Sequence, residues 1–123
     1  MIGTGSPFAP VSWNGRTIPI DQTNNSYVFP GMGLGILAAN ARRVSDAMFM
    51  VAAKAIAQSP QAITEGRLLP RVSALRSVAF SVARAVALQA QADGVADLCA
   101  PEVLDARIKS YVWEPRYRNY ATS

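Results

Sequence analysis

The sequence contains no histidine and has one cysteine, Cys99, among its 123 residues. A Ser-His-Asp triad, a Cys-His nucleophilic pair and a typical zinc site all require histidine, so these kinds of site are excluded. One cysteine also excludes an internal disulfide framework and favours a reducing compartment. Because no histidine is available to activate it, we interpret Cys99 as a small apolar side chain rather than a nucleophile.

Charge and long apolar runs are scarce as well. Charged residues make up 16% of the chain, below the ~25% usual for globular proteins. The longest uncharged stretch, residues 22–41, contains polar residues, Pro30 and three glycines, so no membrane-spanning segment is expected. No basic, apolar and small-residue series opens the chain, so no secretory signal is expected. The net charge is +4, but the basic residues are dispersed, and nucleic-acid binding, which needs them clustered on one face, is not expected.

Residues 1–29 and the remainder of the chain differ in composition. The first part is rich in Gly, Pro, Ser, Thr and Asn, which is typical of short strands and turns. Asn14-Gly15 separates the β-prone triplets 11–13 and 16–18, which predicts a tight β-hairpin because both turn positions need positive φ. The later part is rich in Ala, Leu, Val and Arg, which predicts helices.

Apolar spacing and capping residues predict four helices, over about 31–41, 46–58, 72–90 and 101–109. Pro30 suits a first helical position, Ser45 or Asp46 a helix start, and Gly94 a C-cap. In the third helix we expect an apolar stripe from Val72 to Ala90, with three polar residues off it: Arg76, Arg84 and Gln91. The predicted fold class is mostly α, with a short β-hairpin and strand region at the N-terminus.

Residues 31–35, G-M-G-L-G, superficially resemble a dinucleotide-binding loop. The spacing differs from G-x-G-x-x-G, and Pro30 occupies the position where a strand would end. We therefore interpret these glycines as belonging to a helix packed so closely against another backbone that only glycine fits.

Two groups of polar residues are candidate sites. The acidic pairs Asp93/Asp97 and Glu102/Asp105 are possible metal ligands, but the second pair is explained by a helix N-terminus, and no metal site is expected. Asn24 and Asn25, adjacent amides before an apolar helix, suit recognition of a carboxylate or an amide-bearing ring. A helix cap alone would explain one of them.

Several segments together resemble malic enzymes. Residues 3–11 (G-T-G-S-P-F-A-P-V) resemble the T/S-G-S-P-F-x-P-V segment of that family. Residues 22–25 (Q-T-N-N) and 28–35 (V-F-P-G-M-G-L-G) resemble its Q-x-N-N and I/V-F-P-G-x-G-L-G motifs. Arg42-Arg43, residues 65–70 (E-G-R-L-L-P) and residues 113–117 (W-E-P-R-Y) continue the resemblance, the last as in the bacterial branch.

The resemblance implies a C-terminal segment of an enzyme that converts malate to pyruvate and carbon dioxide with NAD or NADP and Mg²⁺ or Mn²⁺. Residues 1–29 would be the end of the NAD-binding domain, of α/β Rossmann type, with a hairpin and an active-site loop. Residues 30–123 would be the helical C-terminal part that closes it. The family's catalytic tyrosine and lysine, its metal ligands and its dinucleotide glycine loop belong to motifs that are not in this sequence, so the isolated chain is expected to be inactive.

The resemblance also implies roles for four residues. Asn24 and Asn25 would line the substrate pocket, and Thr4 and Gly5 would lie against the cofactor near the nicotinamide. Neighbouring side chains point in different directions, so we expect one amide to face the malate carboxylate. The other would face the cofactor or brace the loop.

The expected partners are malate or pyruvate, the remainder of the enzyme, and further copies in a homo-oligomer (dimer or tetramer), in the cytoplasm. The alternative from residue patterns alone is a small stand-alone helical interaction protein without catalysis.

Overall fold

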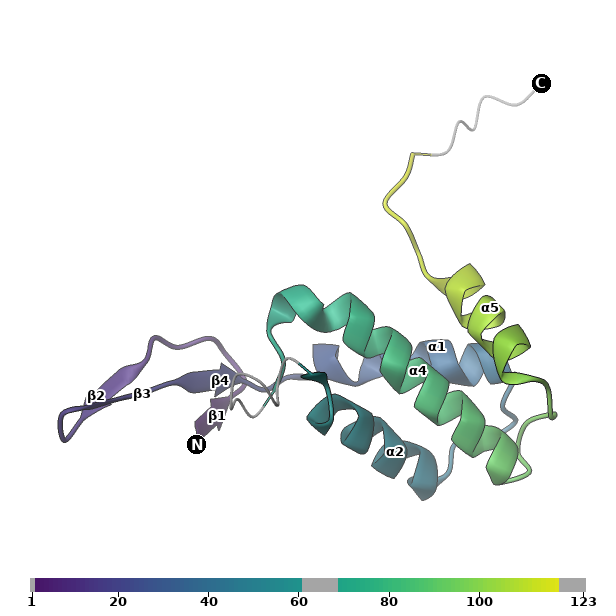
Figure 1. Ribbon diagram of the computed structural model, residues 1–123, viewed down its shortest axis with the longest axis horizontal. Coiled ribbons are helices and arrows are strands. Elements are labelled where there is room, and N and C mark those ends of the chain that lie inside the picture. Colours follow the sequence, from purple (N-terminus) through teal and green to yellow (C-terminus); the bar gives the residue numbers. More distant parts are fainter. Residues whose placement is uncertain (1, 61–68, 118–123) are drawn as a thin grey trace.

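The computed structural model describes residues 2–60 and 69–117, and its helices form one body from which a β-hairpin projects (Figure 1). The hairpin consists of β2 (Val11–Trp13) and β3 (Arg16–Ile18), paired antiparallel. Asn14 and Gly15 have φ values of 48° and 71°. The hairpin predicted from the Asn-Gly dipeptide is therefore confirmed.

A second pair of strands connects the hairpin to the helices. β1 (Ile2–Thr4) and β4 (Ile20–Gln22) are parallel, with Ile2 opposite Ile20 and Thr4 opposite Gln22. The hairpin lies within the connection between them. Because the strands are parallel and in this register, their carboxyl ends lie at the same edge, next to the helical body (Figure 1).

The helical body contains α1 (Phe29–Ala39), α2 (Asp46–Ala57), α4 (Leu75–Ala92) and α5 (Pro101–Tyr111). α4 packs against both α1 and α2, and α5 packs against α1 and α4 (Figure 1). The core contains side chains from all four helices, among them Met32, Met48, Val82, Val86 and Leu104. The predicted fold class, mostly α with short N-terminal strands, is confirmed for the described residues.

The helix boundaries agree with the predicted capping residues. Pro30 lies in the first turn of α1, and the Ser45 hydroxyl accepts a hydrogen bond from the Met48 N–H at the start of α2. α1 ends at Ala39, two residues before the predicted end, because Asn40 adopts a left-handed conformation with φ 51°. A short 3₁₀ helix, η2 (Val72–Ala74), precedes α4.

Two assignments on the third predicted helix are wrong. Val72 was expected on the buried stripe but is 56% exposed, because it belongs to η2 rather than to α4. Gln91 was expected off the stripe but is buried. Its amide donates hydrogen bonds to the Asp97 carbonyl at 3.0 Å and to Cys99 Sγ at 3.2 Å. Pairing with the segment that follows α4 offsets the cost of burying this amide.

The close packing predicted for the glycines of α1 is confirmed at two of three positions. A Cβ at Gly31 would lie 2.7 Å from the Ala79 carbonyl oxygen, and one at Gly35 would lie 2.5 Å from the Ala83 carbonyl oxygen. α1 and α4 therefore approach each other backbone to backbone. A Cβ at Gly33 would meet nothing within 4 Å among the described atoms.

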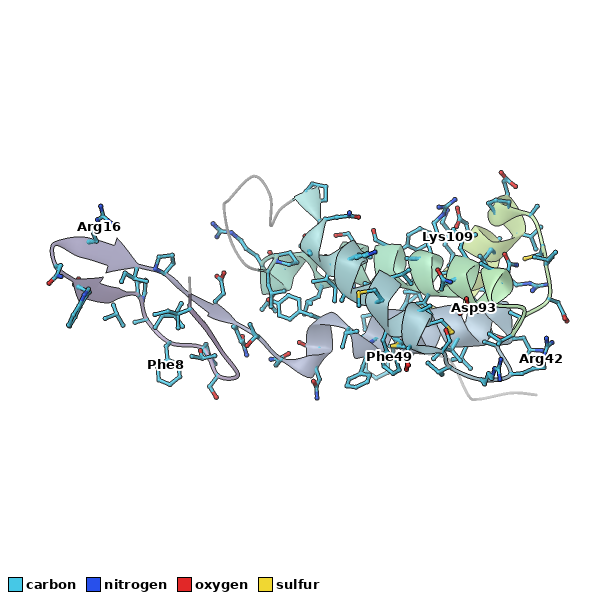
Figure 2. The ribbon with its side chains drawn as sticks, turned by 90° about the horizontal axis from the view of Figure 1, so that it is seen from below. Phe8, Arg16, Arg42, Phe49, Asp93 and Lys109 are labelled. Atoms are coloured by element: carbon cyan, nitrogen blue, oxygen red, sulfur yellow. The ribbon has the colours of Figure 1, made fainter. Side chains whose placement is uncertain are left out.

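At the end of the molecule away from the hairpin, the loop between α1 and α2 is joined to the segment after α4 (Figure 2). Arg42 donates to the Gly94 carbonyl at 3.0 Å and pairs with Asp97 at 3.2 Å. The Asp93 carboxylate accepts hydrogen bonds from the Ser45 hydroxyl and from the Gln89 amide. Both hydrogen bonds lower the pKa of Asp93 below its usual value, and the bond from Ser45 has the larger effect. The positive charge of Arg43 lowers this pKa further.

Candidate functional site

The candidate site lies where β1 and β4 end. The backbone N–H of Thr23 donates to the Thr4 carbonyl at 2.7 Å, which extends the strand pairing by one step. The Gln22 amide donates to the Gly5 carbonyl at 3.4 Å. The segment with the predicted cofactor residues Thr4 and Gly5 is thus bonded to the segment that leads into Asn24 and Asn25.

The turn after β1 is held locally. The Thr4 hydroxyl donates to the Ser6 carbonyl at 2.8 Å. Around Gly5, the nearest atom to an added Cβ is the Thr23 carbonyl oxygen at 3.9 Å, an ordinary contact distance. No close contact from the described residues fills the side of Gly5, so this backbone is accessible to a flat ligand.

Asn24 begins a short 3₁₀ helix, η1 (Asn25–Tyr27). Its Oδ1 atom accepts hydrogen bonds from the Ser26 backbone N–H at 2.9 Å and from the Ser26 hydroxyl. Asn24 is therefore an N-cap, and it braces the loop. From the sequence, a helix cap would explain one of the two adjacent amides, and Asn24 is that amide.

Asn25 differs from Asn24 in its contacts. Its side chain is exposed, and within residues 2–60 and 69–117 it makes no hydrogen bond that would use up its amide. Both the oxygen and the NH₂ group of Asn25 can therefore pair with a ligand. Its role in binding substrate stays a prediction.

Tyr27, which the sequence reasoning missed, anchors this loop. Its ring is 5% exposed, and its hydroxyl donates to the Pro70 carbonyl at 2.8 Å, across 43 residues of sequence. Pro70 itself is fully buried. Because Tyr27 ends η1, the bond fixes the Asn24–Tyr27 loop against the segment that leads into α4. A buried tyrosine needs a partner for its hydroxyl, but the sequence carries no signal that Tyr27 is buried or that Pro70 is its partner.

A pocket of about 310 Å³ adjoins the strand ends. It is lined by side chains from the turn after β1, from β4 and η1, and from the segment before α4: Pro7, Phe8, Ile20, Gln22, Tyr27, Arg71 and Val72. Asn24 and Asn25 precede Tyr27 in the chain but are not among the lining residues. The described chain thus brings the predicted residues to one edge without closing a pocket over the two amides.

Reactive groups are sparse in the described residues. No group of three or more His, Cys, Asp or Glu residues within 2–60 and 69–117 is arranged to hold a metal ion. Of the acidic pairs noted in the sequence, Asp97 pairs with Arg42, and Asp105 pairs with Arg84 at 2.9 Å. Of the further motifs of the resemblance, residues 65–68 of the segment 65–70 lie outside the described ranges.

None of the helices in the described part of the chain is both long and apolar enough to cross a membrane.

Two parallel strands whose carboxyl ends meet beside a glycine-containing turn form the edge at which α/β nucleotide-binding domains hold their ligands. The parallel strand pair and the turn after β1 fit part of such a domain. A family model, malic enzyme NAD-binding domain, matches residues 1–91. The chain belongs to the malic enzyme family.

Curated relatives are similar over nearly the whole chain. The chain is 46% identical to an NAD-dependent malic enzyme of Erwinia tasmaniensis, 47% to one of Proteus mirabilis and 48% to one of Pseudomonas aeruginosa. Each match covers 98% of this chain but 22% of the relative. The chain therefore spans about a fifth of the length of these relatives.

Proposed function

We propose that the chain is the segment of an NAD-dependent malic enzyme that completes the NAD-binding domain and contributes Asn25 to the malate pocket. The whole enzyme would oxidise and decarboxylate malate to pyruvate and carbon dioxide. In this proposal the groups that transfer protons and bind the metal lie in the rest of the polypeptide. This chain orients the substrate and the cofactor.

The observation that carries the proposal is the hydrogen bond between Thr23 and Thr4 at 2.7 Å. It brings the strand end predicted to meet the cofactor and the loop predicted to meet the substrate to one edge of a parallel pair. A hydride can pass between two ligands only when their reacting carbons are held side by side. An edge that presents both segments together suits that requirement.

Each residue has a separate role in the proposal. Asn24 braces the loop through Ser26, and Asn25 hydrogen-bonds the malate carboxylate. An amide does not titrate, so it orients the substrate and moves no proton. The open backbone at Thr4 and Gly5 lies against the nicotinamide. NAD, when bound, accepts the hydride.

The metal implied by the resemblance does not fit the described residues. They bring no three ligand side chains together, and a divalent cation such as Mg²⁺ needs several oxygen ligands. We therefore assign Mg²⁺ or Mn²⁺ to the rest of the enzyme and derive no step through it.

The remaining expectations belong to this proposal. Residues 1–29 would end the NAD-binding domain and residues 30–123 would form the helical part that closes it. The partners would be malate or pyruvate, the rest of the enzyme and further copies of it, in the cytoplasm. The names of the relatives favour NAD over NADP as cofactor.

A hybrid enzyme tests the proposal. The matched segment of the Pseudomonas aeruginosa relative is replaced by this chain, and malate-dependent reduction of NAD is measured. We expect an active hybrid in which Asn25→Ala lowers kcat/KM for malate by about 10- to 100-fold, because a hydrogen bond to a charged group contributes about 1.5–3 kcal/mol.

Gln58→Ala is the matched control, since Gln58 is an exposed amide at the end of α2, far along the chain from the loop. It should leave kcat/KM unchanged. An inactive hybrid, or an Asn25→Ala variant with unchanged kinetics for malate, would contradict the proposal.

A further inference from the structure

α1 is apolar on every side. Its sequence, F-P-G-M-G-L-G-I-L-A-A, contains no polar side chain. A helix with no polar face is normally buried on every side, because exposing apolar side chains to water is unfavourable. In this chain one face is covered by α4, through the close contacts at Gly31 and Gly35.

The opposite face of α1 is left uncovered by residues 2–60 and 69–117. Phe29, Gly33 and Leu37 follow one another at intervals of four residues, so they lie along one line of the helix. Phe29 is 55% exposed and Leu37 is 58% exposed. This line, here termed the outer stripe, is apolar and carries no charge.

Gly33, at the centre of the outer stripe, is not explained by the described residues. Glycine is less favourable than alanine inside a helix, and at Gly31 and Gly35 the contact with α4 accounts for it. At Gly33 an added Cβ would meet nothing within 4 Å. A helix tolerates such a glycine most readily where another backbone approaches closely.

We propose that the outer stripe is the surface on which the rest of the malic enzyme polypeptide packs, with Gly33 as the point of closest approach. This inference rests on the proposed function. It adds to the proposed function the surface through which the rest of the enzyme holds this chain and so positions the Asn24–Tyr27 loop.

Length, chemistry and position favour the rest of the enzyme as the polypeptide that covers the outer stripe. The chain matches 22% of each relative, so most of such an enzyme is available to cover this face. An uncharged line of phenylalanine, glycine and leucine suits permanent core packing, because transient interfaces are more polar. Phe29 lies two residues after Tyr27, the end of η1, and in the proposed function the reactive groups of the rest of the enzyme approach the same loop.

Thiol labelling tests the inference. Leu37→Cys is made in the hybrid enzyme and, separately, in the 123-residue chain, and the modification of residue 37 by a maleimide is followed by mass spectrometry. Ala92→Cys, at an exposed position at the end of α4, is the control. We expect labelling at residue 37 to be at least tenfold slower in the hybrid than in the chain alone, with no such ratio at residue 92.

Equal labelling of residue 37 in the hybrid and in the chain would overturn the inference. So would slow labelling in the chain alone that becomes faster on dilution, because a second copy would then be the occupant.

Gly33→Leu supplies a second test. We expect it to lower the melting temperature of the hybrid by several degrees and to leave that of the chain alone unchanged or higher. Ala92→Leu should change neither. A hybrid that tolerates Gly33→Leu would overturn the inference.

The two proposals fail in different ways. Malate-dependent NAD reduction by the unsubstituted hybrid decides the proposed function. Protection of residue 37 decides the docking surface. A hybrid that is active but unprotected at residue 37 would support the proposed function and contradict the docking surface.

Discussion

At the scale of single residues, the site depends on how firmly the Asn24–Tyr27 loop is held. Asn24 fixes the loop from within, through Ser26. Tyr27 fixes it from outside, through the Pro70 carbonyl. Asn25, between them, is left with an accessible amide. In the proposed function, Asn25 binds the substrate and its neighbours hold its backbone in place.

Tyr27→Phe tests this support. The ring stays buried, but the Pro70 carbonyl loses its hydrogen bond, and an unsatisfied buried group costs about 1–3 kcal/mol. We expect the hybrid enzyme to show a malate KM raised roughly tenfold with a smaller change in kcat, because the loop positions Asn25 less well.

Tyr111→Phe is the control, since Tyr111 is 52% exposed at the end of α5. Loss of stability in Tyr27→Phe without any change in KM would show that Tyr27 supports the fold but not the site.

At the scale of elements, the contact between α1 and α4 determines where the loop lies, because only Val28 separates η1 from α1. We expect Gly35→Ala to destabilise the chain by about 2 kcal/mol, since overpacking a core typically costs about 1–3 kcal/mol. Its Cβ would lie 2.5 Å from a backbone oxygen of α4, which cannot move aside as a flexible side chain would.

Gly33→Ala is the matched substitution on the opposite face of the same helix. In the 123-residue chain it should stabilise by about 1 kcal/mol, the difference in helix propensity. Urea unfolding of both variants checks the pair. Similar changes for Gly33→Ala and Gly35→Ala would contradict the geometry of this contact.

What the sequence predicts in this molecule is local. Asn14-Gly15, Pro30 and Ser45 act within a few residues, and the hairpin and helix starts follow from them. The close packing at Gly31 and Gly35 was also predictable, because glycine inside a helix has a cost that a contact must offset. In the site, the cap at Asn24 follows from the same local rules.

What the sequence does not predict depends on distant partners. The strand Ile20–Gln22 forms because β1 is there to pair with it. Gln91 is buried because the segment after α4 turns back to accept its hydrogen bonds, although a glutamine is ordinarily placed on the solvated face. Tyr27 finds its acceptor 43 residues away. Pairings over such distances depend on topology, which helix and strand periodicity does not specify.

At the scale of the whole molecule, we expect the stability of the fold to depend on pH through Asp93, which lies at the end of the molecule away from the hairpin (Figure 2). Hydrogen bonds from Ser45 and Gln89 lower the pKa of Asp93 in the folded chain. A carboxyl whose pKa is lowered by folding stabilises the fold above its unfolded pKa, about 3.9. That contribution is lost as the pH falls through the folded pKa, because the unfolded chain then binds the proton more readily.

Asp93→Asn should therefore destabilise the chain at neutral pH, and the difference from the unsubstituted chain should shrink as the pH is lowered below about 3.9, the ordinary carboxyl pKa. Urea unfolding at a series of pH values between neutrality and acid measures that difference. Asp97→Asn is the control, because the Asp97 side chain is 89% exposed and such surface ion pairs contribute little. If the difference for Asp93→Asn were constant with pH, the Asp93 carboxylate would not be what links the α1–α2 loop to α4. The hydrogen bond from the Arg42 guanidinium to the Gly94 carbonyl, which does not involve Asp93, would account for the link instead.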